Sequence, residues 1–101
     1  MKYHKKWDSL EATQMFEAMA SLKTIEEYRK FFRDLCTQEE LIDMADRWHA
    51  ARLLATAANY RQVADKARIS TTTVSRVAHW LWHGTGGYQL ILKRLGLIKI
   101  K

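Results

Sequence analysis

Five hydroxyl side chains and one guanidinium fall within seven consecutive positions of this sequence. They are Ser70, Thr71, Thr72, Thr73, Ser75 and Arg76. A hydroxyl can donate or accept a hydrogen bond, so it suits a base edge or a phosphate oxygen, and a threonine methyl can contact a thymine methyl. The types and spacing of these residues therefore make the segment a candidate nucleic-acid contact surface.

The segment that must position these side chains runs from Asn59 to Trp82 and predicts two short helices joined by a tight turn. Its apolar residues have the spacing that two helices need to pack across each other at a steep angle. They are Val63, Ala64, Ala67, Ile69, Val74 and Val77. Ala64 is small enough to let the helices approach closely. We interpret residues 59–82 as a helix-turn-helix with the hydroxyl groups at the start of its second helix.

Both helices of this motif carry start signals. Asn59 and Gln62 have the spacing of a capping box, and Ser70 can accept from the free N–H groups that open the second helix. In the turn, Arg68 stands where this motif most often has glycine, because the backbone there tends towards positive φ. We expect Arg68 to adopt that conformation at some energetic cost. The alternative is that the Ser and Thr residues only begin a solvated helical hairpin.

Positive charge is concentrated in the same half of the chain. Residues 1–59 hold nine Lys/Arg and ten Asp/Glu, whereas residues 60–101 hold eight Lys/Arg and one acidic residue, Asp65. This asymmetry favours a polyanion partner, and we expect Arg61 and Lys66 or Arg68 to contact phosphates. The alternative, a basic surface that only aids solubility, does not by itself favour one half of the chain.

The composition of the whole chain predicts an all-α fold in a single domain, residues 1–101. There is no proline, and all four glycines lie at position 84 or later, which favours helices joined by short, capped turns. The predicted helices, about six, cover residues 8–20, 24–35, 38–58, 59–67, 70–82 and 88–95. We divide the chain into a basic arm or solvated tail (1–7), a helical dimerisation core (8–58), the helix-turn-helix (59–82) and a C-terminal helix (88–96).

Three further helix starts carry capping signals, and one helix end carries a stop signal. The start signals are Asp8 or Ser9, Thr24 with Glu27, and Thr37 with Glu40. Gly84 follows the second helix of the helix-turn-helix. We expect it to end that helix in the left-handed conformation.

The predicted helices carry more apolar surface than one small subunit can bury. The chain is 48% hydrophobic, and aromatic residues such as Phe31, Phe32 and Trp48 lie along the first helices. We therefore expect a homodimer that buries this surface by sharing helices between its subunits. No apolar run reaches the roughly 18 residues of a membrane span. The single Cys36 fits a reducing compartment, so we expect a cytoplasmic protein with no membrane contact.

Other residue types that do chemistry lack partners in the sequence. His79 and His83 are four residues apart on a predicted helix, as a two-ligand metal face requires, but no third ligand lies near in sequence. Cys36 has no evident catalytic partner. The glycine cluster at 84–87 lacks the preceding strand and the Gly-Lys-Ser/Thr sequence of a P-loop. We therefore predict no enzymatic activity, no metal and no cofactor.

The order of these elements resembles the Trp repressor family. The sequences that carry the resemblance are LCTQEELIDMADRWHAARLL, TTTVSRV and GTGGY, and they are most similar to the small Trp-repressor-related proteins of the YerC/YecD type. The resemblance covers roughly residues 21–95. VADKARISTTTVSRV is also similar to the headpieces of Lac-repressor-type regulators, so the preceding helices decide the family. The resemblance implies a Trp-repressor-like, intertwined helical homodimer whose second motif helices meet successive major grooves of a twofold DNA site.

The resemblance also implies roles for individual residues. The DNA-facing positions of the family match Arg61, Thr71, Thr72 and Ser75. The corepressor-binding positions match Thr37, Arg47, Thr73 and Arg76, which can hold a carboxylate and a planar ring. Val77 stands where the repressor has a glycine that leaves room for tryptophan, so we favour a different small-molecule effector, or none. In that case Arg76 contacts a phosphate or forms an ion pair.

These observations predict a sequence-specific transcriptional regulator, a repressor that binds double-stranded DNA as a homodimer. The alternative is a helical protein-interaction module without specific DNA binding, whose basic half faces an acidic partner. The feature that discriminates between them is the hydroxyl-rich helix start, which suits contact with a groove better than a hydrophobic protein interface.

Overall fold

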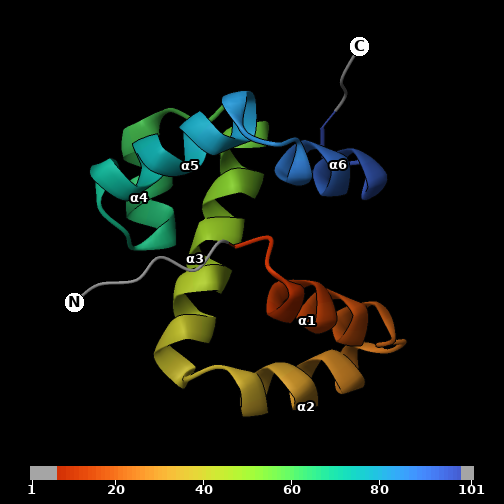
Figure 1. Ribbon diagram of the computed structural model, residues 1–101. Coiled ribbons are helices and arrows are strands. Elements are labelled where there is room, and N and C mark those ends of the chain that lie inside the picture. The colour runs from red at the N-terminus through yellow and green to blue at the C-terminus, as the bar shows by residue number, and fades with distance from the viewer. Residues whose placement is uncertain (1–6, 99–101) are drawn as a thin grey trace, which may run out of the picture. The chain divides into compact units, whose positions relative to one another are not determined.

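The computed structural model describes residues 7–98, which form six α-helices and no strand (Figure 1). The helices are α1 (Leu10–Ala20), α2 (Ile25–Leu35), α3 (Gln38–Ala55), α4 (Tyr60–Ala67), α5 (Thr71–His83) and α6 (Gly87–Arg94). The predicted all-α fold is confirmed. None of these six helices is both long and apolar enough to span a membrane. The arm predicted over residues 1–7 lies, except for Trp7, outside the described residues.

The chain divides into two compact units between Gln38 and Glu39. In the first unit, Ser9 Oγ accepts a hydrogen bond from the N–H of Ala12 at 3.2 Å, and α1 begins there. Thr24 Oγ1 accepts from the N–H of Glu27 at 3.1 Å. The reciprocal half of the expected capping box is displaced by one residue, since the Glu27 carboxylate accepts from the N–H of Lys23 at 2.8 Å.

The helices of the first unit leave many of their apolar residues exposed. No residue of α1 or α2 is buried. Leu10 remains 69% exposed and Ile25 77% exposed. Within α2, the rings of Tyr28 and Phe32 lie 6.2 Å apart in a stacked arrangement. The aromatic residues of α2 thus contact one another along the helix rather than filling a core.

The longest helix, α3, begins at Gln38 as predicted but ends at Ala55, three residues earlier than expected. The reason lies in Ala57, which adopts a left-handed backbone with φ of 65°. The N–H groups of Thr56 and Ala57 turn back to the carbonyls of Leu53 and Leu54 at 3.0 and 3.1 Å. This conformation normally selects glycine or asparagine, so an alanine here gives no stop signal in the sequence.

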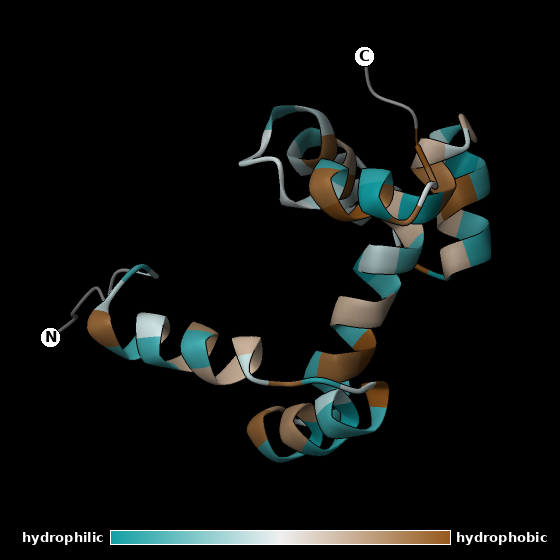
Figure 2. Cartoon of the chain, turned by 90° about the vertical axis from the view of Figure 1, so that its right-hand side faces the viewer, coloured by the Kyte–Doolittle hydropathy of each residue, from teal (hydrophilic) through white to brown (hydrophobic). Residues whose placement is uncertain are grey.

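The second unit is built around one apolar core. Its buried residues come from four helices: Ala50, Ala51 and Leu54 of α3; Val63, Ala64 and Ala67 of α4; Val74, Val77, Ala78 and Leu81 of α5; and Leu92 of α6. In Figure 1, α4 and α5 lie beside the C-terminal half of α3. Figure 2 shows hydrophobic and hydrophilic positions interleaved along each helix, as amphipathic helices require. No polar or charged side chain of the described residues is buried.

Gly84 ends α5, but not in the conformation that the sequence predicted. Its φ of −85° and ψ of −157° are extended, and the left-handed glycine of this turn is Gly86, with φ of 95°. Gly84 is required for a different reason: a Cβ built on it would lie 2.4 Å from the carbonyl oxygen of Trp80. Its own N–H donates to that oxygen at 3.0 Å. Close backbone approach therefore explains this glycine.

The turn after α5 is tied back to the helix by a side chain. Nε2 of Gln89, in α6, donates to the carbonyl oxygen of Leu81 at 2.8 Å. The carbonyls in the last turn of a helix have no partner within the helix, so this bond satisfies one of them. It also fixes α6 to the end of α5, where Leu92 enters the core.

Replacing Gly84 with alanine tests the close approach. We expect G84A to lower the free energy of unfolding by about 1–3 kcal/mol, because the added methyl group forces the backbone away from the Trp80 carbonyl. G87A is the matched control, since a Cβ at Gly87 meets nothing within 4 Å and its φ is not positive. Urea denaturation followed by circular dichroism measures both. Equal stabilities of the two variants would contradict this account.

Candidate nucleic-acid interface and pocket

The first helix of the helix-turn-helix, α4, is fixed by a complete capping box. The N–H of Gln62 donates to Oδ1 of Asn59 at 2.8 Å, and the N–H of Asn59 donates to Oε1 of Gln62 at 3.1 Å. Both predicted members of the box are confirmed. Val63, Ala64 and Ala67 of α4 are buried in the core. The capping box fixes where α4 begins, and the buried residues fix which side of the helix faces inward. Arg61 and Lys66 therefore remain exposed.

The turn between α4 and α5 has the strained backbone that the motif predicts. Arg68 adopts φ of 59° and ψ of 44°, the left-handed conformation. Its N–H and that of Ile69 both point back to the carbonyl of Ala64, the latter at 3.1 Å. The prediction of positive φ at Arg68 is confirmed. The side chain of Arg68 is exposed, and Ile69 is half-buried against the core.

The hydroxyl groups at the start of α5 fall into two sets. Ser70 caps the helix by accepting from the N–H of Thr73 at 3.1 Å, and the two hydroxyl oxygens lie 3.0 Å apart. These hydroxyls are engaged within the helix start. Thr71, Thr72 and Ser75 are exposed, and among residues 7–98 their hydroxyls have no hydrogen-bond partner. Three hydroxyls of the predicted contact set are thus available to a ligand, above a buried face formed by Val74 and Val77.

The same two helices and their turn carry four cationic side chains. Arg61, Lys66, Arg68 and Arg76 are all exposed. None of the four forms an ion pair with a described residue, and the one acidic residue after position 59 is Asp65. Unpaired surface cations beside free hydroxyl groups present the chemistry that phosphate and base edges require.

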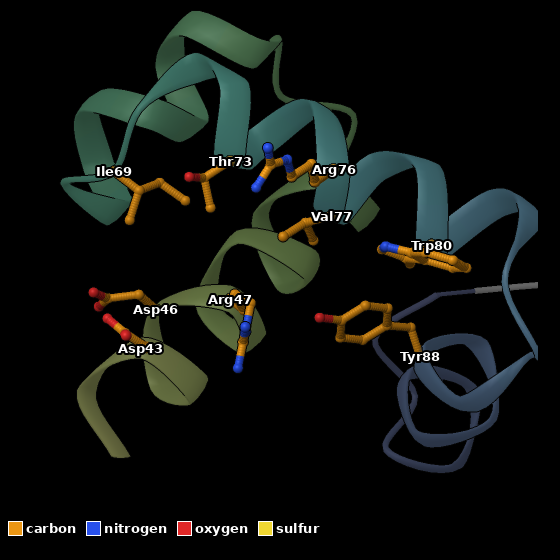
Figure 3. A pocket seen from close by; sticks show the side chains of 9 residues that line it. All are labelled: Asp43, Asp46, Arg47, Ile69, Thr73, Arg76, Val77, Trp80 and Tyr88. Carbon is orange, nitrogen blue, oxygen red and sulfur yellow. The ribbon is translucent and has the colours of Figure 1, made fainter. Parts of the chain in front are cut away.

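A pocket with a volume of about 360 Å³ lies between α3, α5 and α6 (Figure 3). It is lined by Asp43, Asp46, Arg47, Ile69, Thr73, Arg76, Val77, Trp80 and Tyr88. Three of the four residues predicted for an effector site, Arg47, Thr73 and Arg76, are therefore brought together. Val77 lines the same pocket. Thr37, the fourth predicted residue, directly precedes α3 and does not line this pocket.

Five pocket residues were not identified from the sequence as site residues: Asp43, Asp46, Ile69, Trp80 and Tyr88. The spacing of Asp43, Asp46 and Arg47 places them on one face of a helix, so the sequence could have identified both aspartates as neighbours of Arg47. Tyr88 reaches the pocket only because the turn after α5 folds α6 back, and its ring stacks on Trp48 with 6.3 Å between centroids. No local pattern predicts that approach.

His79 and His83 lie on the exposed surface of α5, with ring centroids 5.6 Å apart. His79 also contacts the ring of Trp80 edge-on at 5.1 Å. Among residues 7–98, no group of three or more His, Cys, Asp or Glu side chains is placed to hold a metal ion. Cys36 is a free, half-buried cysteine.

Comparisons with known proteins agree on one group of relatives. The family model for Trp repressor protein matches residues 9–96. The uncharacterised protein YerC of Bacillus subtilis (strain 168) is 38% identical over 85 residues, which is 84% of this chain and 82% of YerC. The crystal structure of a TrpR-like protein from Eubacterium eligens matches with a TM-score of 0.86 and 34% identity, over 93% of this chain and 97% of that one. A candidate Trp repressor from Staphylococcus aureus matches with a TM-score of 0.84 and 29% identity, over 91% and 92%.

The strained turn generates a stability prediction. We expect R68G to raise the free energy of unfolding by about 0.5–1 kcal/mol, because glycine adopts the left-handed conformation without the steric cost that arginine bears. R68A is the matched control, since it removes the same charge but retains a Cβ. Thermal unfolding followed by circular dichroism compares them. A glycine variant no more stable than the alanine variant would show that the turn is not strained.

Proposed function

We propose, since the chain belongs to the Trp repressor family, that it is a sequence-specific DNA-binding regulator of transcription that acts as a repressor. The observation that carries the proposal is the exposed start of α5, where Thr71, Thr72 and Ser75 lie above the buried Val74 and Val77. In a helix-turn-helix these early positions of the second helix reach base edges in the major groove. The cytoplasm is the compartment that this role requires.

Within this proposal the polar residues have different tasks. Thr71, Thr72 and Ser75 read base edges, because their hydroxyls have no partner among the described residues. Arg61, Lys66 and Arg68 contact phosphates and set the position of the motif on the duplex. Ser70 and Thr73 act mainly through the capping bond that fixes the start of α5, with their remaining hydrogen-bonding capacity directed at the nearest phosphate.

We further propose that the regulator is a homodimer. The apolar side chains of α1 and α2 support this, since no residue of these two helices is buried and Ile25 is 77% exposed. Apolar surface of this extent in a DNA-binding protein calls for a second copy to cover it. Two recognition helices related by a twofold axis would meet half-sites about 34 Å apart, one turn of the DNA helix.

The pocket beside α5 is proposed as the effector site. Thr73 and Arg76 line it and also belong to the DNA-contacting helix, so a ligand bound there touches the residues that face DNA. Val77 lines the same space, which disfavours an indole ring as the ligand.

One observation favours a second candidate function, a protein-interaction module. Trp80 is 57% exposed and Trp82 50% exposed at the end of α5, away from the hydroxyl-rich start. Exposed tryptophans are enriched at the centres of protein interfaces. Under this alternative the basic half of the chain faces an acidic protein, and binding to duplex DNA shows no preferred sequence.

A selection of bound sequences from a random duplex pool, followed by anisotropy titrations across salt concentrations, tests DNA binding. We expect a twofold motif that binds far more tightly than a scrambled duplex. R61A should weaken binding to all duplexes alike and reduce the salt slope by about 2, because each subunit of the dimer loses one phosphate contact. T72A should instead alter the binding free-energy difference between bases, by about 1–3 kcal/mol, at one position of each half-site.

R29A is the control for these variants, because Arg29 is an exposed arginine of α2 outside the helix-turn-helix. It should leave both the preferred sequence and the salt slope unchanged. Equal losses on all sequences for T72A and R61A would contradict the assigned roles. Binding without any preferred sequence would favour the interaction module.

Sedimentation velocity at micromolar concentration tests the dimer. We expect a species with twice the mass of the chain. I25E should raise the dissociation constant at least about tenfold, because a charge would be buried at the subunit interface. K66E introduces the same residue on α4 and should leave the dimer intact. A wild-type protein that sediments as a stable monomer would exclude the proposed assembly.

A further inference from the structure

The C-terminal part of α5 carries two imidazole rings that the proposed DNA contacts do not use. His79 and His83 are both exposed, and their ring centroids lie 5.6 Å apart. A spacing of four residues places both rings on one face of the helix, about one turn apart. Among residues 7–98, neither imidazole forms a hydrogen bond or an ion pair, and the one further aromatic contact is between His79 and Trp80. Both rings are therefore accessible, and a neutral imidazole has one nitrogen free to act as a metal ligand.

The separation of the rings fits a shared metal ion. A divalent transition ion binds an imidazole nitrogen at about 2.0–2.1 Å, which places the ion about 3.2 Å from the centre of the ring. Two rings on one tetrahedral ion therefore have centroids about 5.2 Å apart. The observed separation of 5.6 Å is close to this value, and exposed side chains rotate by the small angles required within nanoseconds. Binding thus requires no change in the backbone of α5.

The position of the pair in the helix also favours a cation. His79 and His83 lie in the last two turns of α5, which ends at His83. The C-terminal end of a helix carries a partial negative charge of about half an elementary charge, which stabilises a cation there. Arg76, the one permanently charged side chain of α5, opposes a cation. Its repulsion is screened by water, because this arginine is exposed.

The ligand atoms determine which ions fit. Imidazole nitrogen suits Zn²⁺, Ni²⁺ and Cu²⁺, whereas Mg²⁺ and Ca²⁺ require several oxygen ligands. Among residues 7–98, no group of three or more His, Cys, Asp or Glu side chains is placed to hold an ion. Water therefore completes the coordination of an ion bound to the two rings. The resulting site is open, like catalytic zinc sites and unlike closed structural ones.

We propose that His79 and His83 form a two-histidine chelate for a divalent transition ion of the Zn²⁺, Ni²⁺ and Cu²⁺ class. The bound ion joins side chains one helical turn apart and so stabilises the end of α5. The prediction of no metal required a third protein ligand, which a chelate completed by water does not need. Thr71, Thr72 and Ser75 lie in the first turns of α5, so the metal site uses none of the residues proposed to read bases.

Titration calorimetry with nickel chloride and zinc chloride tests the site on the full-length protein without DNA, in a buffer that does not bind metals. We expect one ion to bind per chain, and magnesium chloride to give no binding. H79Q and H83Q should each raise the dissociation constant at least about tenfold, because each removes one of the two ligands. No binding of Ni²⁺ and Zn²⁺ at concentrations up to about 1 mM, or an unchanged affinity in both variants, would overturn the proposal.

H49Q is the matched control, because His49 is an exposed histidine of α3 that does not belong to the pair. It should bind Ni²⁺ with the affinity of the wild-type protein. All three substituted rings are exposed, so the variants lose no buried contact and should remain folded. An equal loss of affinity in H49Q and H79Q would show that the site is not the one proposed.

Thermal unfolding detects the bridge across the helical turn. Ni²⁺ at about a hundredfold its dissociation constant should raise the unfolding midpoint by at least about 5 °C, because the folded helix holds both ligands together and the unfolded chain does not. The double variant H79Q H83Q should show no such shift. A shift of the same size in that variant, or none in a wild-type protein that binds Ni²⁺, would contradict the bridge. DNA is absent from both measurements, so their outcome does not depend on the proposed function.

Discussion

Close packing of small side chains is the constraint on which the second unit depends. Five of its eleven buried residues are alanines, and they come from α3, α4 and α5. Small residues at helix contacts let the backbones approach, so these three helices can share a core that a few valines and leucines fill. Because this core contains no polar side chain, burial alone fixes which side of α5 faces inward. The hydroxyl groups and the arginine of α5 therefore face outward.

Features of the fold that depend on bonds between near neighbours could be predicted from the sequence. The capping box of Asn59 and Gln62 and the left-handed turn at Arg68 involve groups no more than four residues apart, so spacing and residue type identify them. Predictions failed where the backbone conformation was not indicated by the residue type. Ala57 is left-handed without being glycine or asparagine, and Gly84 is required by its approach to Trp80 rather than by its φ.

The pocket was predictable only in part, for a different physical reason. Arg47, Thr73 and Arg76 were expected from family resemblance, and the structure places them together. Asp43 and Asp46 lie on the same helical face as Arg47, but helix spacing alone does not show what that face adjoins. Tyr88 reaches the pocket through the fold of the α5–α6 turn, which joins residues that no periodicity relates. Contacts between elements, rather than within them, therefore mark the limit of sequence reasoning here.

The bond between Gln89 and the Leu81 carbonyl has a consequence for the dynamics of α5. A helix normally frays from its ends, and its terminal amides exchange with solvent through local opening. Here the last turn of α5 cannot open independently, because Gln89 holds it and Leu92 anchors α6 in the core. Amide hydrogens of the α5 end and of α6 should exchange as one cooperative unit. With Ser70 capping its start, α5 is held at both ends.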